Sequence, residues 1–286
     1  MIAIVGGLAS AVLWATTLLG AARSARVIGS WSTLAWVMLV GLIVAVPLVA
    51  VAPPVVLGQR EILLLSAAGV ANSGGLILVY TALRRGKVGV VGPIVSTEGA
   101  IGAVLAIVAG DEVAGPVLAI LTFVAVGVVL AAFERAAPGP TDTGVVPVSA
   151  TVTALLALGG ALLFGINLFA TSRIAADLPI AWTLLPARVA GVVAVTIPLA
   201  LGRRLRLTRA VVPFVIVVGL AEVAGTATFA LGSRDSAAIA AVLASQFAGI
   251  AAIVAWLLFG ERLNRVQIAG VTVIALGVAT LALLRA

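Results

Sequence analysis

The chain of 286 residues carries 17 basic and 10 acidic residues, a formal net charge of +7, and is 63% apolar and only 9% charged. A typical soluble domain is about 25% charged, so we expect lipid rather than water around most of this surface. The sequence has no cysteine and no histidine, which excludes disulfides and most zinc or haem ligation, and we expect no metal site and no cofactor. Nucleic acid is not an expected partner, because the arginines occur singly or in small clusters between apolar runs.

Apolar runs long enough to cross a membrane follow one another along the whole chain. A bilayer core about 30 Å thick needs roughly 20 residues of helix. The first run lacks the basic segment of a cleaved signal peptide, so we interpret it as a membrane helix. The predicted spans are residues 2–20, 31–52, 61–81, 88–109, 114–133, 151–171, 180–201, 209–231, 236–259 and 266–285. The sequence therefore predicts an all-α membrane protein with ten transmembrane helices.

The second half of the chain repeats the pattern of the first at an offset near 150 residues. Ser96 falls on Ser245, Glu112 on Glu261 and Gly127 on Gly277. We therefore predict a first five-helix repeat at residues 1–135, a linker rich in Pro, Gly and Thr at 136–149, and a second repeat at 150–286. Because five is odd, the second repeat enters the membrane from the opposite side, which predicts two inverted repeats of the kind found in many secondary transporters.

The loop charges predict the orientation. Twelve Lys and Arg residues lie in the loops after the odd-numbered spans, and four lie on the other side. The side richer in these residues is the cytoplasmic one, so both termini are predicted outside.

Three ionisable residues lie near the middle of predicted spans: Glu98, Arg188 and Glu222. Each costs roughly 2.5–3.5 kcal/mol at a helix centre, so each needs a partner or a water-filled cavity. The two acids and one base leave one carboxyl that is either hydrated or protonated, as proton coupling requires. One hypothesis gives Arg188 a substrate carboxylate and a glutamate an ammonium group or a proton. The alternative is a structural ion pair, and the sequence does not rank the two glutamates.

Uncharged polar and aromatic residues gather on the same spans and pair across the repeat. Thr17 matches Asn167, and Ser96-Thr97 matches Ser245-Gln246. The symmetric grouping predicts a central cavity, whereas a single such side chain more often only hydrogen-bonds a neighbouring helix, at about 0.6 kcal/mol. Trp14 and its match Phe164 are either stacking surfaces or fillers. With the three charges, the candidate pathway residues are Trp14, Asn72, Tyr80, Ser96, Thr97, Asn167 and Gln246.

The two turns before the last helix of each unit read Gly110-Asp111-Glu112 and Gly260-Glu261-Arg262-Leu263. Together with the duplication, they make the chain resemble the EamA-type drug/metabolite transporter family along nearly its whole length. The resemblance implies a ten-helix bundle around a central cavity and alternating-access transport, often export, of small metabolites. It implies no particular ligand. The basic loops after the first and third spans, rather than after the second, depart from the family pattern.

We therefore expect a multi-pass secondary transporter of the bacterial cytoplasmic membrane. It would export small polar or zwitterionic, amino-acid-like metabolites, with protons as a candidate coupling ion, as a monomer or homodimer. The alternatives are an uncoupled facilitator, an exporter of organic cations and a structural membrane protein. A membrane enzyme is disfavoured because the chain lacks His and Cys, has no clustered acids for a metal, and has short loops.

Overall fold

The computed structural model describes residues 1–86, 88–112, 114–131, 150–247, 249–251, 254 and 265–284. The regular elements of these residues are all helices, and six helical segments among them are long and apolar enough to cross a membrane: Ile2–Ile28, Ser30–Ala50, Gln59–Arg85, Thr151–Asp177, Ala181–Leu201 and Val212–Ser233. This confirms the all-α class. The predicted linker at 136–149 and the turn at 260–263 lie outside the described residues.

The longest helices extend beyond their predicted spans. Their bounds are Ile2–Ile28 for α1, Gln59–Arg85 for α3 and Ala150–Asp177 for α7. At 1.5 Å per residue, a helix of 27 residues is about 40 Å long, which exceeds the apolar core but fits the bilayer with its headgroups. The helices continue through their terminal charged residues because the backbone hydrogen bonds remain satisfied within the helix. The other two long helices are α2 (Ser30–Ala50) and α10 (Val212–Ser233).

Other predicted spans are interrupted. The fourth is split into α4 (Val88–Val95) and α5 (Glu98–Val108), and in the ninth α11 ends at Ala244 after starting at Ala237. The seventh begins as α8 (Ala181–Gly191), passes through the π-helical turn η1 (Val192–Thr196), and ends as α9 (Ile197–Leu201). Pro198 is the second residue after η1 and has no N–H to offer the preceding turn, which accounts for the irregular hydrogen bonding there.

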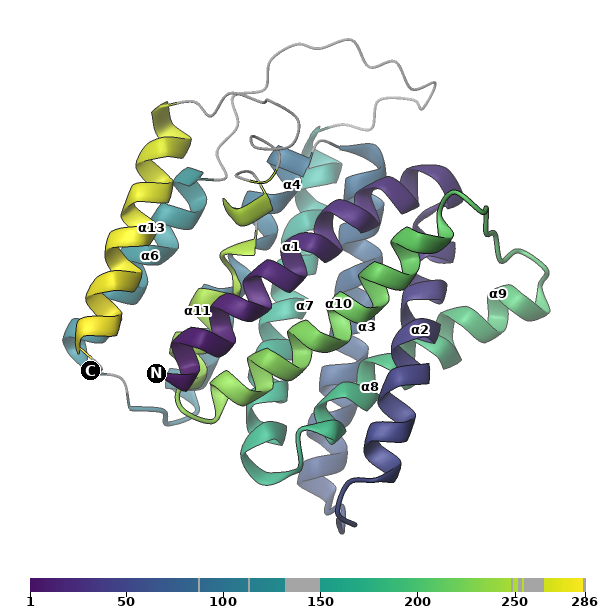
Figure 1. Ribbon diagram of the computed structural model, residues 1–286, viewed down its shortest axis with the longest axis horizontal. Coiled ribbons are helices and arrows are strands. Elements are labelled where there is room, and N and C mark those ends of the chain that lie inside the picture. Colours follow the sequence, from purple (N-terminus) through teal and green to yellow (C-terminus); the bar gives the residue numbers. More distant parts are fainter. Residues whose placement is uncertain are drawn as a thin grey trace.

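The helix contacts occur in matched pairs across the repeat. α1 packs along α10 as α7 packs along α3, α2 contacts α10 as α8 contacts α3, and α1 contacts α11 as α7 contacts α4. α6 (Gly115–Ala131) and α13 (Arg265–Leu284) pack against each other at one side of the bundle, at the left of Figure 1. Figure 1 also shows α1 and α10 running in opposite directions and the two chain ends at the same end of the bundle.

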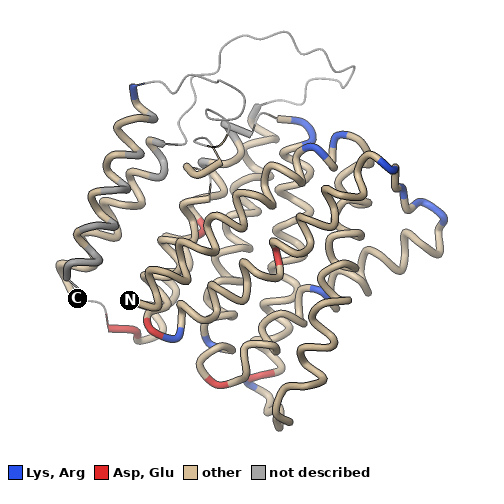
Figure 2. The backbone as a smooth tube through the Cα atoms, viewed as in Figure 1, with Lys and Arg blue, Asp and Glu red and all other residues tan. Residues whose placement is uncertain are grey.

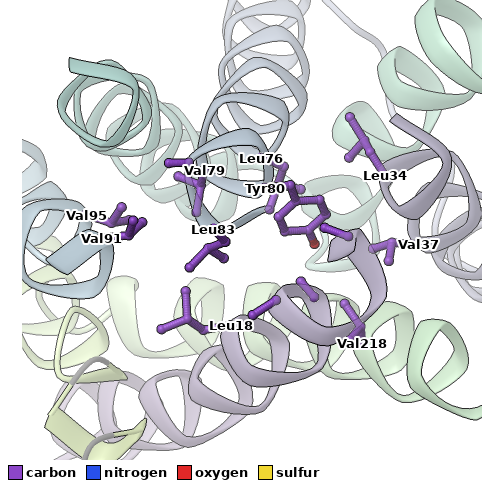
Figure 3. Packing of buried hydrophobic residues seen from close by; sticks show 14 of the residues in the cluster. Leu18, Leu34, Val37, Leu76, Val79, Tyr80, Leu83, Val91, Val95 and Val218 are labelled. Carbon is purple, nitrogen blue, oxygen red and sulfur yellow. The ribbon is translucent and has the colours of Figure 1, made fainter. Parts of the chain in front are cut away.

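The largest apolar core surrounds α3. Leu76, Tyr80 and Leu83 of α3 are buried there with residues of α1, α2, α4 and α10. Figure 3 shows these side chains converging between the helices. The core holds the central helices together around the polar residues of the next section.

The charged residues lie mainly at the two ends of the bundle, with only isolated positions along the helices (Figure 2). At one end, here called the basic end, α1 and α3 finish and α10 starts (Figure 1). The last two turns of α1, the last turn of α3 and the loop before α10 supply its arginines, namely Arg23, Arg26, Arg84, Arg85, Arg203, Arg204, Arg206 and Arg209. The opposite end, called the terminus end, mixes both signs. There Arg60 Nη1 lies 2.5 Å from Asp177 Oδ2, and Arg173 Nη2 lies 2.8 Å from Asp111 Oδ1.

Candidate functional site

A cavity lies between the central helices, about midway along them. Its volume is about 50 Å³, whereas one water needs about 10–15 Å³, so it has room for a few waters or a small polar group. Its walls come from α1, α3, α4, α5, α7 and α10, together with Phe247. The lining residues are Trp14, Thr17, Leu18, Asn72, Leu76, Val79, Tyr80, Val95, Glu98, Phe164, Asn167, Leu168, Glu222 and Phe247.

Glu222 forms an ion pair on one wall of this cavity. Its Oε1 lies 3.9 Å from Arg188 Nη1 and accepts a hydrogen bond of 3.3 Å from Asn72 Nδ2. Both ion-pair partners are buried, with Arg188 1% and Glu222 3% exposed. A buried ion pair is favourable only when both charges keep their partner, because the desolvation of either charge alone is costly. The structure thus decides the pairing that the sequence left open: Glu222, not Glu98, is the partner of Arg188.

Arg188 itself does not line the cavity. Its Nη1 also donates to the sulfur of Met38 at 4.0 Å, and a Cβ placed on Gly41 would lie 2.7 Å from its Cδ and Nε. α8 is anchored next to it by Ser73, whose hydroxyl donates to the carbonyl of Ala187 at 2.9 Å. Arg188, on α8, therefore packs against α2 behind Glu222 and is not among the lining residues of the cavity. Its buried Nε and Nη2 have no hydrogen-bond partner among the described residues.

Glu98 is the second carboxyl at the cavity and has no ion-pair partner among the described residues. It is 3% exposed and occupies the first turn of α5, directly after the break in the fourth span. The N-terminus of a helix favours negative charge because its backbone N–H groups point outward without partners. Glu98 is thus a buried carboxyl placed beside a polar helix end and open to the cavity.

The two helix breaks share one backbone pattern. The N–H of Ser96 donates to Gly92 and that of Thr97 to Ile94, just as the N–H of Ser245 donates to Ala241 and that of Gln246 to Leu243. In each break, a hydrogen bond that spans four residues, as in an α-helix, is followed by one that spans three residues, as in a 3₁₀-helix. This change ends the helix at the same place in both halves. The predicted match of Ser96-Thr97 with Ser245-Gln246 is therefore a match of two helix breaks, and these side chains flank the cavity rather than line it.

Two aromatic side chains that match across the predicted repeat, Trp14 and Phe164, line the cavity. Trp14 of α1 lies against Gly225 of α10, and Phe164 of α7 lies against Gly75 of α3. A Cβ on either glycine would come within 2.5 Å of the facing ring. Because the glycines let each ring settle between two helices, both aromatic side chains reach the cavity wall.

Several polar atoms of the lining residues have no hydrogen-bond partner within the described part of the chain. They are Trp14 Nε1, Thr17 Oγ1, Asn72 Oδ1 and Tyr80 Oη. Buried polar groups are normally satisfied, so such atoms around one cavity point to a bound polar molecule or water. The set contains donors and an acceptor, and the cavity can therefore hold a polar ligand by hydrogen bonds.

Of the ten candidate residues, Trp14, Asn72, Tyr80, Glu98, Asn167 and Glu222 line the cavity, Arg188 lies behind it, and Ser96, Thr97 and Gln246 lie at or beside the breaks. Sequence reasoning missed the apolar half of the lining. Leu18, Leu76 and Leu168 each follow a polar or aromatic lining residue by four positions, which is one helical turn. This four-residue spacing is the sequence signal from which these leucines could have been predicted.

Comparisons with known proteins agree with this picture. The sequence model of the EamA-like transporter family matches residues 1–133. No curated protein sequence matches. Among the solved structures that match, one crystal structure, described only as that of a protein, aligns over 99% of this chain and 96% of its own with a TM-score of 0.76 at 17% identity. That similarity shows a shared fold.

Proposed function

We propose that this membrane protein, whose residues 1–133 match the model of the EamA-like transporter family, is a secondary transporter that exports small polar metabolites by alternating access. The observation that carries the proposal is the cavity midway along the helices, with two carboxyls and four polar atoms on its walls that have no partner among the described residues. Binding at the membrane midplane between repeats is the arrangement that alternating access requires.

We propose ten transmembrane helices in two inverted five-helix repeats. The matched helix contacts, the matched breaks at Ser96 and Ser245, and the opposite directions of α1 and α10 in Figure 1 support this layout. An approximate twofold axis in the membrane plane would relate the halves, and exchanging their conformations would open the cavity alternately to the two sides.

Glu98 is the residue that we propose for coupling. It is a carboxyl at the cavity without a cation beside it among the described residues, and a proton is the smallest partner that can neutralise it. Exchange of a proton for substrate at Glu98 would couple export to proton entry. The amino group of an amino-acid-like metabolite would bind to the same carboxyl in place of the proton.

We propose the bacterial cytoplasmic membrane as the location, with the basic end of the bundle on the cytoplasmic side. Loop arginines favour the cytoplasmic side. Both termini would then lie outside, since Figure 1 places them at the end opposite the basic loops.

The function is tested with purified protein in liposomes and a panel of radiolabelled amino acids, amines, nucleosides and sugars. At least one compound should cross faster than in protein-free liposomes, and an opposing proton gradient should accelerate it. Glu98→Gln should lose the acceleration, whereas Glu112→Gln, the same change at an exposed loop carboxyl, should keep it. If no compound crosses, a structural role explains the protein better. Transport with an unchanged gradient response in Glu98→Gln would indicate an uncoupled facilitator.

A further inference from the structure

The loop between α9 and α10, residues 202–211, lies at the outer edge of the basic end, at the right of Figures 1 and 2. It carries four exposed arginines: Arg203, Arg204, Arg206 and Arg209. Neither these nor the other arginines of the basic end form an ion pair with any acid that the structure describes. Like charges gathered in one place repel one another, so a surface of this kind favours an anionic partner.

The loop is fixed to α2 rather than standing free in solvent. Trp36 Nε1 donates to the carbonyl of Arg206 at 2.9 Å. The N–H of Arg206 in turn donates to Ser32 Oγ at 3.2 Å. The backbone of the loop is therefore held at both its donor and its acceptor side, and its arginines are presented from a defined position.

The end of α1 adjoins the same loop. Val211, the last residue of the loop, is buried in one apolar cluster with Ile28 at the end of α1. The guanidinium group of Arg23 on α1 lies over the ring of Phe214 on α10, 5.1 Å from the ring centroid. The arginines of α1 and those of the loop thus belong to one basic surface.

Arg203 has a backbone conformation that is normally left to glycine. Its φ is +51°, whereas the preceding Gly202 has an ordinary φ of −75°. The N–H of Arg203 donates to the carbonyl of Ala200 at 3.0 Å, and that of Arg204 donates to Leu199 at 2.8 Å. These two bonds define a Schellman motif, in which glycine is favoured at the place that Arg203 occupies. Backbone strain of this kind is concentrated where a side chain has a function.

Exposed apolar side chains lie next to these arginines in the chain. Ile197 is 45% exposed, Leu201 82% and Leu207 40%. In a membrane, such side chains contact acyl chains, while the guanidinium groups beside them reach the headgroup level. A phospholipid presents the same sequence of groups, with a phosphate above its acyl chains, and arginine binds phosphate oxygens through two parallel N–H groups.

We propose that the loop of residues 202–211, together with the end of α1, is a binding surface for the headgroup of an anionic phospholipid. Arg203 is the arginine that the backbone strain singles out for the phosphate contact. The exposed leucines on either side of it contact the acyl chains of the same lipid. This inference goes beyond the proposed transport function and does not depend on it, because it requires only that the chain lies in a membrane.

The test compares anionic phosphatidylglycerol with zwitterionic phosphatidylcholine that has the same acyl chains. Each lipid is titrated into the full-length protein in a neutral detergent at low salt, and the unfolding temperature is recorded. Phosphatidylglycerol should raise the unfolding temperature, because it binds the folded state, and phosphatidylcholine should not. High salt should reduce the shift, since it screens the exposed charges.

Arg203→Gly removes one positive charge and relieves the backbone strain. Without lipid, this variant should unfold at the same temperature as the wild type or at a higher one. The concentration of phosphatidylglycerol that gives half of the shift should rise about fivefold, which is the effect of one arginine near an anionic surface. Arg60→Gln removes the same charge at the terminus end and should keep the wild-type concentration.

Equal stabilisation by the two lipids overturns the proposal, and so does an unchanged response to phosphatidylglycerol in Arg203→Gly. A lower unfolding temperature of Arg203→Gly without lipid also contradicts it, because contacts within the protein would then hold the side chain. The soluble headgroup analogue glycerol 1-phosphate is tested in parallel. If it gives the same shift at the same concentration, the surface binds free phosphate esters and the lipid assignment is wrong.

Discussion

At the scale of single residues, Arg188 and Met38 come from the two halves of the chain, 150 positions apart, and touch each other. Asn72 and Glu222 are separated by the same interval and share a hydrogen bond. Each contact thus joins one residue from each half of the chain. The charged residue of each contact, Arg188 or Glu222, comes from the second half.

Arg188→Met should destabilise the protein strongly, because it leaves Glu222 buried without a counter-ion. Breaking one partner of a buried ion pair costs about 3–5 kcal/mol. The double variant Arg188→Met with Glu222→Gln removes both charges and should recover most of that loss. Thermal unfolding of the purified variants in detergent gives the comparison. A double variant as unstable as the single one would mean that Arg188 stabilises the fold by packing rather than by charge.

At the scale of elements, the breaks in the fourth and ninth spans matter most for the site. The break after Val95 lets a new helix begin at Glu98, so the carboxyl lies at a helix start. An unbroken helix would place Glu98 within a continuous ladder of backbone bonds, without free N–H groups nearby. Irregular backbone at membrane depth is tolerated where it faces a cavity or other protein, and here it faces both.

The paired glycines under the aromatic rings give a second prediction. Gly75→Ala or Gly225→Ala would place a methyl group against the ring of Phe164 or Trp14 and push the ring into the cavity. We expect at least a tenfold loss of transport with a modest loss of stability. Gly115→Ala is the matched control, since a Cβ there meets no atom within 4 Å. Transport equal to wild type in both ring-contacting variants would show that the rings do not shape the pathway.

At the scale of the whole molecule, the two ends of the bundle differ in how their arginines are satisfied. At the terminus end, Arg60 and Arg173 have carboxylate partners, and Arg234 donates to the carbonyls of Ala175 and Leu178 at 2.6 and 2.9 Å. The eight arginines of the basic end have no ion pair within the described residues. Their charge is therefore free to interact with an anionic lipid surface, such as that of a cytoplasmic leaflet.

This difference predicts the orientation, and the lack of native cysteines makes it simple to test. Val56→Cys, 97% exposed in the connection between α2 and α3, should react with a membrane-impermeant maleimide in intact cells. Leu207→Cys, in the basic loop before α10, should react only after the membrane is opened. Both substitutions keep every loop arginine. The reverse labelling pattern would place the termini in the cytoplasm.

Much of the architecture could be predicted from residues alone, because it depends on local properties. Runs such as 31–52 and 180–201 are too apolar for water and long enough for a bilayer, and the repeat is visible as matched residues such as Ser96 and Ser245. The helix ends were less predictable, since a helix continues through charged residues such as Arg26 once its end lies among headgroups. The break at Ser96 and the π-helical turn were not foreseen, because apolar runs look alike whether or not the backbone is regular.

The sequence by itself determined that the chain is helical and apolar enough for a membrane, predicted a duplication, and singled out Glu98, Arg188 and Glu222 as the charges in need of an explanation. Only the tertiary structure decided that Arg188 pairs with Glu222 and lies behind the wall, and that Glu98 is left at the cavity without a counter-ion. The physical reason is that the residue pattern of a single helix is enough to indicate which of its faces is buried. The choice of partner depends instead on how α3, α8 and α10 cross, and the contacting residues of α3 are more than a hundred residues from those of the other two helices in the chain.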